Sequence, residues 1–259
     1  MIDSHCHLAD KVFADDLEAV VERARLAGLT GALVILSAGD AAEEAQAARV
    51  SSLWDGVRFA IGVHPHAAHE HADQPDRVVD IVRAQWARMP NARAIGEIGL
   101  DYHYDFSPRE VQQQVFRRQV RLARELGRPV VIHTREADAD TIAILTEEGQ
   151  GKLRGVLHCF TGTPDLARAG LDLGFYISVA GILTFPKASE LRDTVKAVPI
   201  ERLLIETDSP YLAPVPFRGK RNEPSYVGRV AEVLADLHGV TAAEMAASSS
   251  RAFGELFAP

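Results

Sequence analysis

The sequence predicts a (β/α)8 barrel, because eight short apolar runs bounded by Gly or Pro alternate with amphipathic segments along its 259 residues. Strands of a parallel sheet that helices cover on both faces have this continuous apolar character, and each parallel connection needs a crossover helix. No Pro/Gly/Ser-rich linker divides the chain, so we expect a single domain over residues 1–259. The alternative is an open doubly wound sheet, which the lack of a G-x-G-x-x-G motif after any early strand disfavours.

The expected strands are the eight apolar runs. They cover residues 1–6, 31–36, 57–63, 93–98, 129–133, 155–158, 175–179 and 203–207. In the first intervening segment, Leu17, Val20, Val21 and Ala24 recur at helical spacing, and Gly28 is expected to end that helix.

Helix starts are marked by capping sequences. Ser107-Pro108-Arg109-Glu110 predicts a capping box at the start of the longest helix, which Gly127 should end. The Thr163-Pro164-Asp165 stretch opens another helix in the same way. A second capping box, Thr241-Ala242-Ala243-Glu244, predicts an additional C-terminal helix to about residue 257.

Composition limits the classes of function. The net charge of −8 argues against broad, unspecific adhesion to nucleic acid, although a polyanionic substrate can still bind at a local, metal-charged site. The two cysteines, Cys6 and Cys159, are too few for a disulfide framework and fit a reducing compartment. No apolar run is long enough to span a bilayer, and Met1 leads directly into the first motif. We expect a soluble, cytoplasmic protein without a membrane role, acting as a monomer.

Histidines and carboxylates gather at the carboxyl ends of the expected strands. His5 and His7 are two residues apart on the first strand, so both imidazoles project from one face. The other members of this set are His64, His66, Glu97, His133, His158 and Asp208. In a barrel the carboxyl ends of the strands converge on the catalytic face, so these residues are expected to become neighbours.

The set is too large for one tetrahedral zinc that keeps an open position, so we expect two divalent ions. Glu97 is the expected bridge between them. One ion would take His5, His7, Glu97 and Asp208, and the other Glu97, His133 and His158. Imidazole with carboxylate suits Zn²⁺ or Mn²⁺, while Mg²⁺ prefers more oxygen, so the identity of the ion stays open.

The expected chemistry is hydrolysis by a metal-activated water, with Glu97 and Asp208 as the catalytic carboxylates. Asp208 would orient the water and take its proton. Glu206 lies two residues earlier on the same face and is either a partner for the free N–H of a ligand histidine or a core carboxylate paired with an arginine.

Three residues are candidates for substrate contacts. We assign His66 to a phosphate or leaving-group contact and Arg135 to an anionic oxygen. Arg218 lies in the loop Pro216-Phe217-Arg218-Gly219-Lys220-Arg221, which is either a local anion funnel or an ordinary solvated turn.

The order of the motifs resembles the TatD family of metal-dependent deoxyribonucleases over essentially the whole chain. The motifs that carry this resemblance are His5-Cys6-His7-Leu8, Gly62-Val63-His64-Pro65-His66, Gly96-Glu97-Ile98-Gly99-Leu100-Asp101, His133-Thr134-Arg135, His158-Cys159-Phe160-Thr161-Gly162, Glu206-Thr207-Asp208-Ser209-Pro210-Tyr211-Leu212 and Arg218-Gly219-Lys220-Arg221-Asn222-Glu223-Pro224. The resemblance implies an amidohydrolase-type barrel with two divalent ions. It also implies hydrolysis of DNA phosphodiesters, often from the 3′ end, with single strands or 3′ ends as the expected substrate.

Carried over to this sequence, the metal ligands of the family fall on the six residues assigned above to the two ions, and Asp208 is also the base. One rival function is hydrolysis of a small-molecule ester, lactone or amide with the same ions. A second rival, from another class, is a non-catalytic metal-binding scaffold. The expected open coordination position argues against it, because a structural metal site is normally closed.

Overall fold

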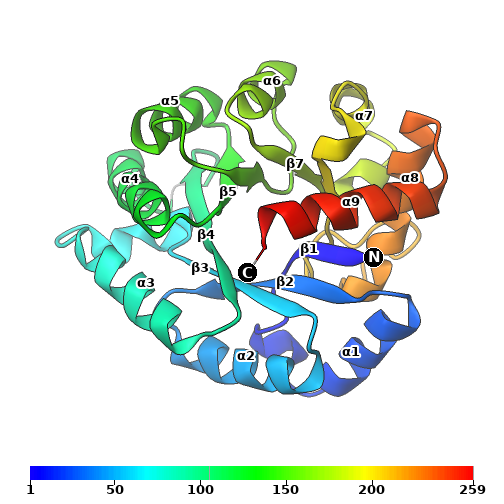
Figure 1. The fold of residues 1–259 in the computed structure, drawn as a ribbon, viewed down its shortest axis with the longest axis horizontal. Coiled ribbons are helices and arrows are strands. Elements are labelled where there is room, and N and C mark those ends of the chain that lie inside the picture. The colour runs from blue at the N-terminus through cyan, green and yellow to red at the C-terminus, as the bar shows by residue number, and fades with distance from the viewer. Residues whose placement is uncertain (105, 259) are drawn as a thin grey trace. The chain divides into compact units, whose positions relative to one another are not determined.

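Eight parallel strands form one sheet in which the spatial order of the strands follows the chain, and each strand leads into a helix (Figure 1). The structure is a computed structural model that describes residues 1–104 and 106–258. This order, with one further helix at the C-terminus, is the predicted (β/α)8 barrel and confirms the fold class.

The strands are β1 (Ile2–Cys6), β2 (Gly31–Ser37), β3 (Val57–Gly62), β4 (Ala92–Asp101), β5 (Val130–Arg135), β6 (Gly155–Leu157), β7 (Tyr176–Val179) and β8 (Leu203–Ile205). The α-helices are α1 (Leu17–Leu26), α2 (Ala41–Leu53), α3 (Arg77–Arg88), α4 (Arg109–Leu126), α5 (Asp138–Gly149), α6 (Pro164–Asp172), α7 (Ser189–Lys196), α8 (Val227–His238) and α9 (Ala242–Leu256). None of the helices in the described part of the chain is long and apolar enough to cross a membrane.

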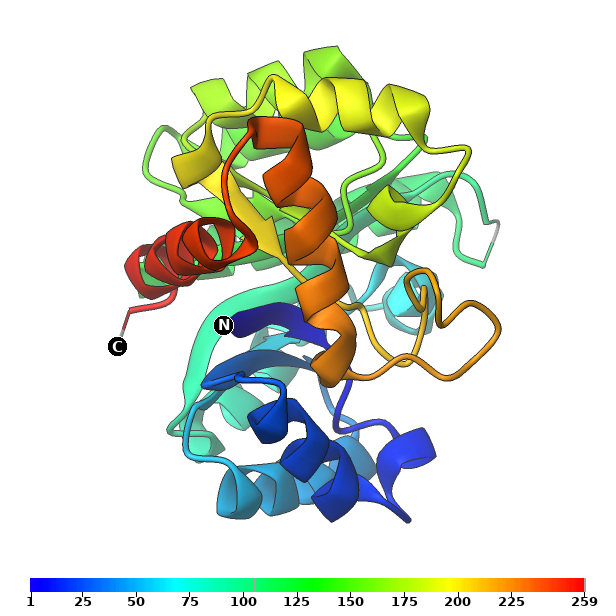
Figure 2. The same ribbon diagram turned by 90° about the vertical axis from the view of Figure 1, so that its right-hand side faces the viewer.

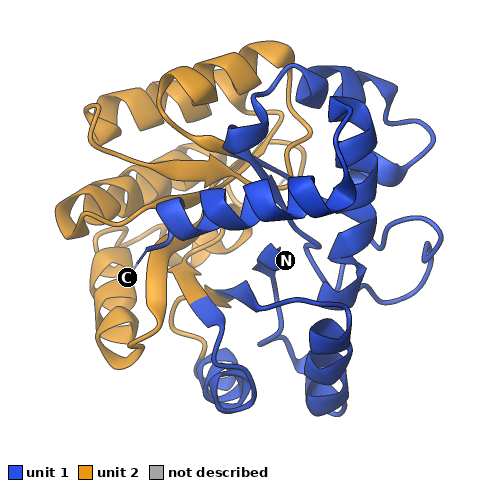
Figure 3. Ribbon diagram, turned by 45° about the vertical axis from the view of Figure 1, so that its right-hand side comes forward, with its two compact units in different colours: residues 1–35, 41–58, 177–258 blue, residues 36–40, 59–176, 259 orange. Residues whose placement is uncertain are grey.

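The chain divides into two compact units, which Figure 3 colours separately. Unit 1 comprises residues 1–35, 41–58 and 177–258, and unit 2 comprises residues 36–40 and 59–176. In unit 1 the added helix α9 packs beside α8, β8 and β1 (Figure 2). In unit 2 α4 and α5 lie side by side against β4 and β5. The prediction of a single domain is not tested by this division and stays a prediction.

Most of the predicted helix boundaries are confirmed. The four apolar residues predicted for α1 are buried, and Gly28 has the left-handed backbone (φ +85°) that follows a helix end. Thr163 caps α6 by accepting a hydrogen bond from the backbone N–H of Leu166. Thr241 and Glu244 form the predicted capping box of α9. Both cysteines are present as thiols, and Cys6 is buried.

The capping box predicted at Ser107 is wrong. Helix α4 begins after Pro108, and no side-chain cap bond is made there. The Ser107 hydroxyl instead donates to the carbonyl of His66 and accepts the backbone N–H of His69, both at 2.9 Å. A serine can satisfy either a helix end or a loop, and here the loop after β3 supplies the partners.

The predicted end of the fourth strand at Ile98 is also wrong, because β4 continues to Asp101. Gly99, which bounds the predicted run, and Gly96, which lies within it, both allow close packing against β5. A Cβ at Gly96 would lie 2.6 Å from Cβ of Val131, and one at Gly99 (φ +144°) would overlap the His133 carbonyl oxygen.

Two of the predicted ligands lie where strand pairing is irregular. The β4–β5 register shifts between Ile95 and Ile98, which brackets Glu97, and the β1–β2 register shifts between Asp3 and Cys6, which brackets His5. Bulges of this kind re-aim a side chain and are common beside active sites.

Candidate metal centre

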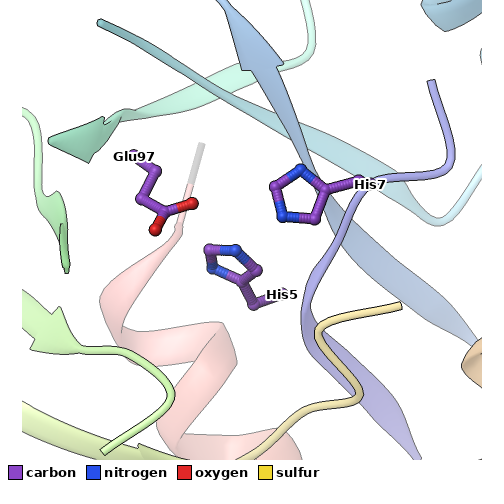
Figure 4. Close-up of side chains that lie close together, drawn as sticks. All are labelled: His5, His7 and Glu97. Carbon is purple, nitrogen blue, oxygen red and sulfur yellow. The ribbon is translucent and has the colours of Figure 1, made fainter. Parts of the chain in front are cut away.

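Unit 1 brings together three predicted ligands, His5, His7 and Asp208. Figure 4 shows the imidazoles of His5, on β1, and of His7, which follows it, and their ring centroids are 5.2 Å apart. Asp208 Oδ1 lies 3.6 Å from Nε2 of His5 and 3.3 Å from Nε2 of His7. One carboxylate oxygen therefore faces two imidazole nitrogens, which is a donor set that suits Zn²⁺ or Mn²⁺.

Backbone pairing with β1 fixes the position of Asp208. Its N–H donates to the His5 carbonyl at 2.9 Å, and the His7 N–H donates to the Ser209 carbonyl at 2.8 Å. Asp208 has a left-handed backbone (φ +55°), which aspartate tolerates better than most residues. Such strained positions persist where the surroundings hold them, and they cluster at active sites.

Asp3 supports the same segment, and sequence reasoning gave it no role. It is fully buried, and its carboxylate accepts the N–H and the hydroxyl of Thr207 at 2.9 and 2.6 Å. Burial raises the pKa of Asp3 to about 8, while the hydrogen bonds from Thr207 oppose the rise. The sequence signal was an acidic residue two positions before His5, on the same face of the strand.

Asn222 ties down the loop that carries Asp208. It is fully buried, and its Nδ2 donates to the carbonyls of Thr207 and Tyr211 at 2.8 and 2.6 Å. Asn222→Ala leaves both carbonyls without this donor, so we expect the free energy of unfolding to fall by about 2–4 kcal/mol. Thermal and urea unfolding measure the change.

The control for this variant is Asn91→Ala, which removes the same side chain at a half-buried position just before β4. It should alter the free energy of unfolding by less than about 1 kcal/mol. If Asn222→Ala unfolds at the wild-type temperature, its side chain does not brace the loop.

Unit 2 brings together the other predicted ligands around Glu97. The Oε1 atom of this buried carboxylate lies 2.8 Å from Nε2 of His158 and 3.0 Å from Nδ1 of His133. His64 is a third neighbour, with Nε2 at 3.3 Å, and its ligand atom lies within 4.8 Å of those of Glu97 and His133. Three imidazoles around one carboxylate oxygen fit a divalent ion in residue type and spacing.

The charge of Glu97 suits ligation. Burial alone would raise its pKa, but the nearby imidazoles of His158 and His64 and the hydrogen bonds with His133 and His158 lower the pKa well below its usual range. Glu97 is therefore ionised at neutral pH, which a metal-ligating carboxylate must be.

Asp101 is a member of this group that sequence reasoning missed. It is buried, and its Oδ2 lies 3.0 Å from Nε2 of His133 and 2.9 Å from Nε2 of His66. Burial would raise the pKa of Asp101, but hydrogen bonds from His133, Tyr104 and His66 lower it. A metal-ligating histidine commonly donates its other N–H to such a carboxylate, which fixes the tautomer and the ring orientation. The available signal was the even spacing between Glu97 and Asp101 along one strand.

His64 also lies nearer the centre than the sequence indicated. Its Nδ1 accepts the backbone N–H of His66 at 3.1 Å, so the ring proton is on Nε2, which faces Glu97. Burial lowers the pKa of His64 to about 4, with the Glu97 charge opposing the shift. This imidazole is therefore neutral at pH 7 and can donate a hydrogen bond. The second H-x-H pattern, His64-Pro65-His66, was the signal for it.

Two of the residues predicted to contact substrate, Arg135 and Arg218, lie over aromatic rings. The Arg135 guanidinium lies 4.8 Å above the Tyr104 ring, and that of Arg218 lies 3.9 Å above the Phe185 ring. Arg221 pairs with Asp16 at 2.6 Å, so only part of the positive charge of the loop 216–221 is available to an anion. The substrate roles of His66, Arg135 and Arg218 stay predictions.

Glu206 is fully buried, and its Oε2 accepts the hydroxyl of Ser178 at 2.5 Å. Ser178 also lies 2.9 Å from the hydroxyl oxygen of Ser4 on β1. These contacts attach Glu206 to neighbouring strands in unit 1. The prediction that it supports a ligand histidine stays a prediction.

Comparison with known proteins gives one consistent result. The model of the family described as "TatD related DNase" matches residues 2–258. The uncharacterized metal-dependent hydrolase YcfH of Escherichia coli K12 is 42% identical, with 99% of this chain and 95% of YcfH covered. A protein of Pantoea vagans named 3′-5′ ssDNA/RNA exonuclease TatD is 38% identical, with 95% of each chain covered. The crystal structure of YjjV, a TatD homolog from E. coli K12, is similar with a TM-score of 0.89 and 31% identity, over 99% of this chain and 97% of that one.

Proposed function

Because this chain belongs to the TatD-related DNase family and is a metal-dependent hydrolase, we propose that it hydrolyses DNA phosphodiester bonds, removing nucleotides from the 3′ ends of single strands. The 38% identical protein named as a 3′-5′ ssDNA/RNA exonuclease supports the substrate and the polarity. The observation that carries the proposal is the buried, ionised Glu97 with its close imidazole neighbours, among them His133 and His158. We further propose that the protein works in the cytoplasm as a monomer.

We propose that two divalent ions, Mg²⁺, Mn²⁺ or Zn²⁺, bind at the carboxyl ends of the strands. His5, His7 and Asp208 would hold one, His133 and His158 the other, and Glu97 would bridge them. When bound, such ions activate water and neutralise charge on the phosphate. The chemistry of the donors fits, since each group in its own unit combines a carboxylate with imidazoles.

The side chains of the protein have distinct roles in this proposal. Asp208 accepts the proton of the attacking water, for which its place beside His5 and His7 is suited. His66 contacts the phosphate or the leaving group, and the guanidinium groups of Arg135 and Arg218 donate to phosphate oxygens. Asp101 keeps the His133 ring oriented by accepting its Nε2–H.

The test is a time course on 3′- and 5′-labelled single-stranded DNA with chelator-stripped protein to which Mg²⁺, Mn²⁺ or Zn²⁺ is returned. We expect no cleavage without metal and a ladder shortening from the 3′ end with metal. His133→Ala should lose both metal retention and cleavage, since it removes one proposed ligand. His238→Ala, at the C-terminal end of α8, is the control and should cleave as the wild type does.

Intact DNA under every metal would contradict the nuclease assignment. A panel of carboxylate esters, lactones and amides then separates the remaining functions. Turnover of one of these would assign a small-molecule hydrolase with the same ions. An inactive panel at full metal occupancy would favour a non-catalytic metal-binding scaffold.

A further inference from the structure

Two exposed aromatic rings stand next to the unit 2 ligands, in the segment between β4 and α4. Tyr104 is 41% exposed and Phe106 is 59% exposed. Their rings are stacked, with centroids 5.4 Å apart and planes at 18°. Leaving large apolar rings in water forgoes the free energy of burial, so an exposed stacked pair beside a catalytic centre points to a ligand.

The ring pair is fixed to the site by Asp101. Oδ1 of Asp101 accepts the backbone N–H groups of His103 and Tyr104, both at 3.0 Å. Its Oδ2 contacts the Nε2 atoms of His66 and His133. One buried carboxylate therefore sets the positions of the aromatic segment and of a proposed metal ligand.

The His66 ring lies close to both the aromatic pair and His133. Its ring centroid lies 4.8 Å from that of Phe106, 5.6 Å from that of Tyr104 and 6.1 Å from that of His133. The Arg135 guanidinium also contacts Tyr104. Tyr104 is thus contacted by several groups, whereas Phe106 presents the larger exposed surface.

The chemistry of this surface selects a flat ring that is attached to a negative charge. Aromatic side chains beside a positive groove bind single-stranded nucleic acid by stacking on bases, whatever the sequence. Phe106 offers an exposed ring, and Arg135 offers a positive charge over the Tyr104 ring on which Phe106 stacks. An aliphatic acyl group would call for an enclosing apolar pocket, and an exposed ring face does not enclose its ligand.

We propose that Phe106, supported by Tyr104, stacks on a nucleobase of the terminal or the adjacent nucleotide of the substrate strand, with Arg135 beside the backbone phosphate. This inference rests on the proposed function and adds the base-contacting residue to it. It assigns Phe106 to strand binding, so its loss should raise KM and leave kcat nearly unchanged.

The experiment compares Phe106→Leu, which keeps apolar bulk but removes the ring, with Phe106→Trp, which keeps a stacking face. Each is assayed on a single-stranded oligonucleotide and on the same strand with tetrahydrofuran in place of the last two nucleosides at its 3′ end. Phe106→Leu should raise KM about tenfold on the normal strand and change it little on the base-free strand, since stacking contributes about 1–3 kcal/mol per base. Phe106→Trp should stay within about twofold of the wild type on both.

Leu26→Ala, at a 78% exposed apolar side chain on α1, is the control and should behave as the wild type does. Fluorescence anisotropy of the normal strand with chelator-stripped protein measures binding without cleavage and should show the same loss for Phe106→Leu.

The outcomes separate the two proposals. If the wild type cleaves DNA but Phe106→Leu binds normally, or weakens both strands equally, the stacking proposal is overturned and the nuclease assignment stands. A shift in sedimentation of Phe106→Leu without a change in KM would overturn it in favour of self-association through this surface. If the metal-loaded wild type neither cleaves nor binds the normal strand, the proposed function and the stacking proposal both fall.

Discussion

Glu97→Gln is expected to lose metal retention and to hydrolyse DNA at least about 10³-fold more slowly than the wild type, because a ligand in the proposed bridging position would support several kcal/mol of transition-state stabilisation. Glutamine keeps the shape and one carbonyl oxygen but removes the charge that faces His133 and His158. The low pKa of Glu97 means that the wild-type residue supplies this charge throughout the neutral range. Elemental analysis after gel filtration measures the metal, and initial rates on labelled DNA measure the activity.

The control is Glu148→Gln, which alters another poorly exposed glutamate in unit 2. Glu148 pairs with Arg121 on the helix side, at 2.6 Å, so its loss should affect stability without affecting metal content. Full metal content in Glu97→Gln would remove Glu97 from the proposed ligand set.

Asp208→Asn is expected to lower kcat by about 10²- to 10⁴-fold, the usual contribution of a general base, with KM within about threefold of the wild type. Asparagine is the informative substitution because it tolerates the left-handed backbone of this position as well as aspartate does, so the loop should keep its conformation. It also keeps an oxygen that can face His5 and His7 while losing the ability to take a proton.

Single-turnover rates separate the chemical step from binding in this variant. The folded state is checked by thermal unfolding, in which Asp208→Asn should match the wild type more closely than Asn222→Ala does. Undiminished single-turnover cleavage by Asp208→Asn would exclude Asp208 as the base.

Much of the architecture follows from local patterns in the sequence. The apolar periodicity of α1 and the caps at Thr163 and Thr241 are properties of neighbouring residues, and the structure confirms them. The capping box at Ser107 is wrong for the opposite reason, since a distant loop at His66 and His69 competes for the same hydroxyl. Local sequence does not reveal such a competitor.

The candidate site was likewise predicted from the sequence in part. The residue types of the candidate metal centre and the strands that carry them could be predicted, because strand periodicity fixes which side chains share a face. The extension of β4 beyond Ile98 could not be predicted, because Gly96 and Gly99 serve contacts with β5 that only the packed sheet contains. The importance of Asp101 was missed with it.

By itself the sequence determined the barrel, the ends of several helices and the histidine and carboxylate types of the candidate centre, since periodicity and capping act between residues close in the chain. Tertiary structure alone decided the partners of these groups. Asp101 faces His66 and His133, and Arg221 is neutralised by Asp16. A sequence pattern gives the face on which a side chain lies, but the group opposite it comes from another strand or helix, and the free energy of that contact depends on the distance that folding sets.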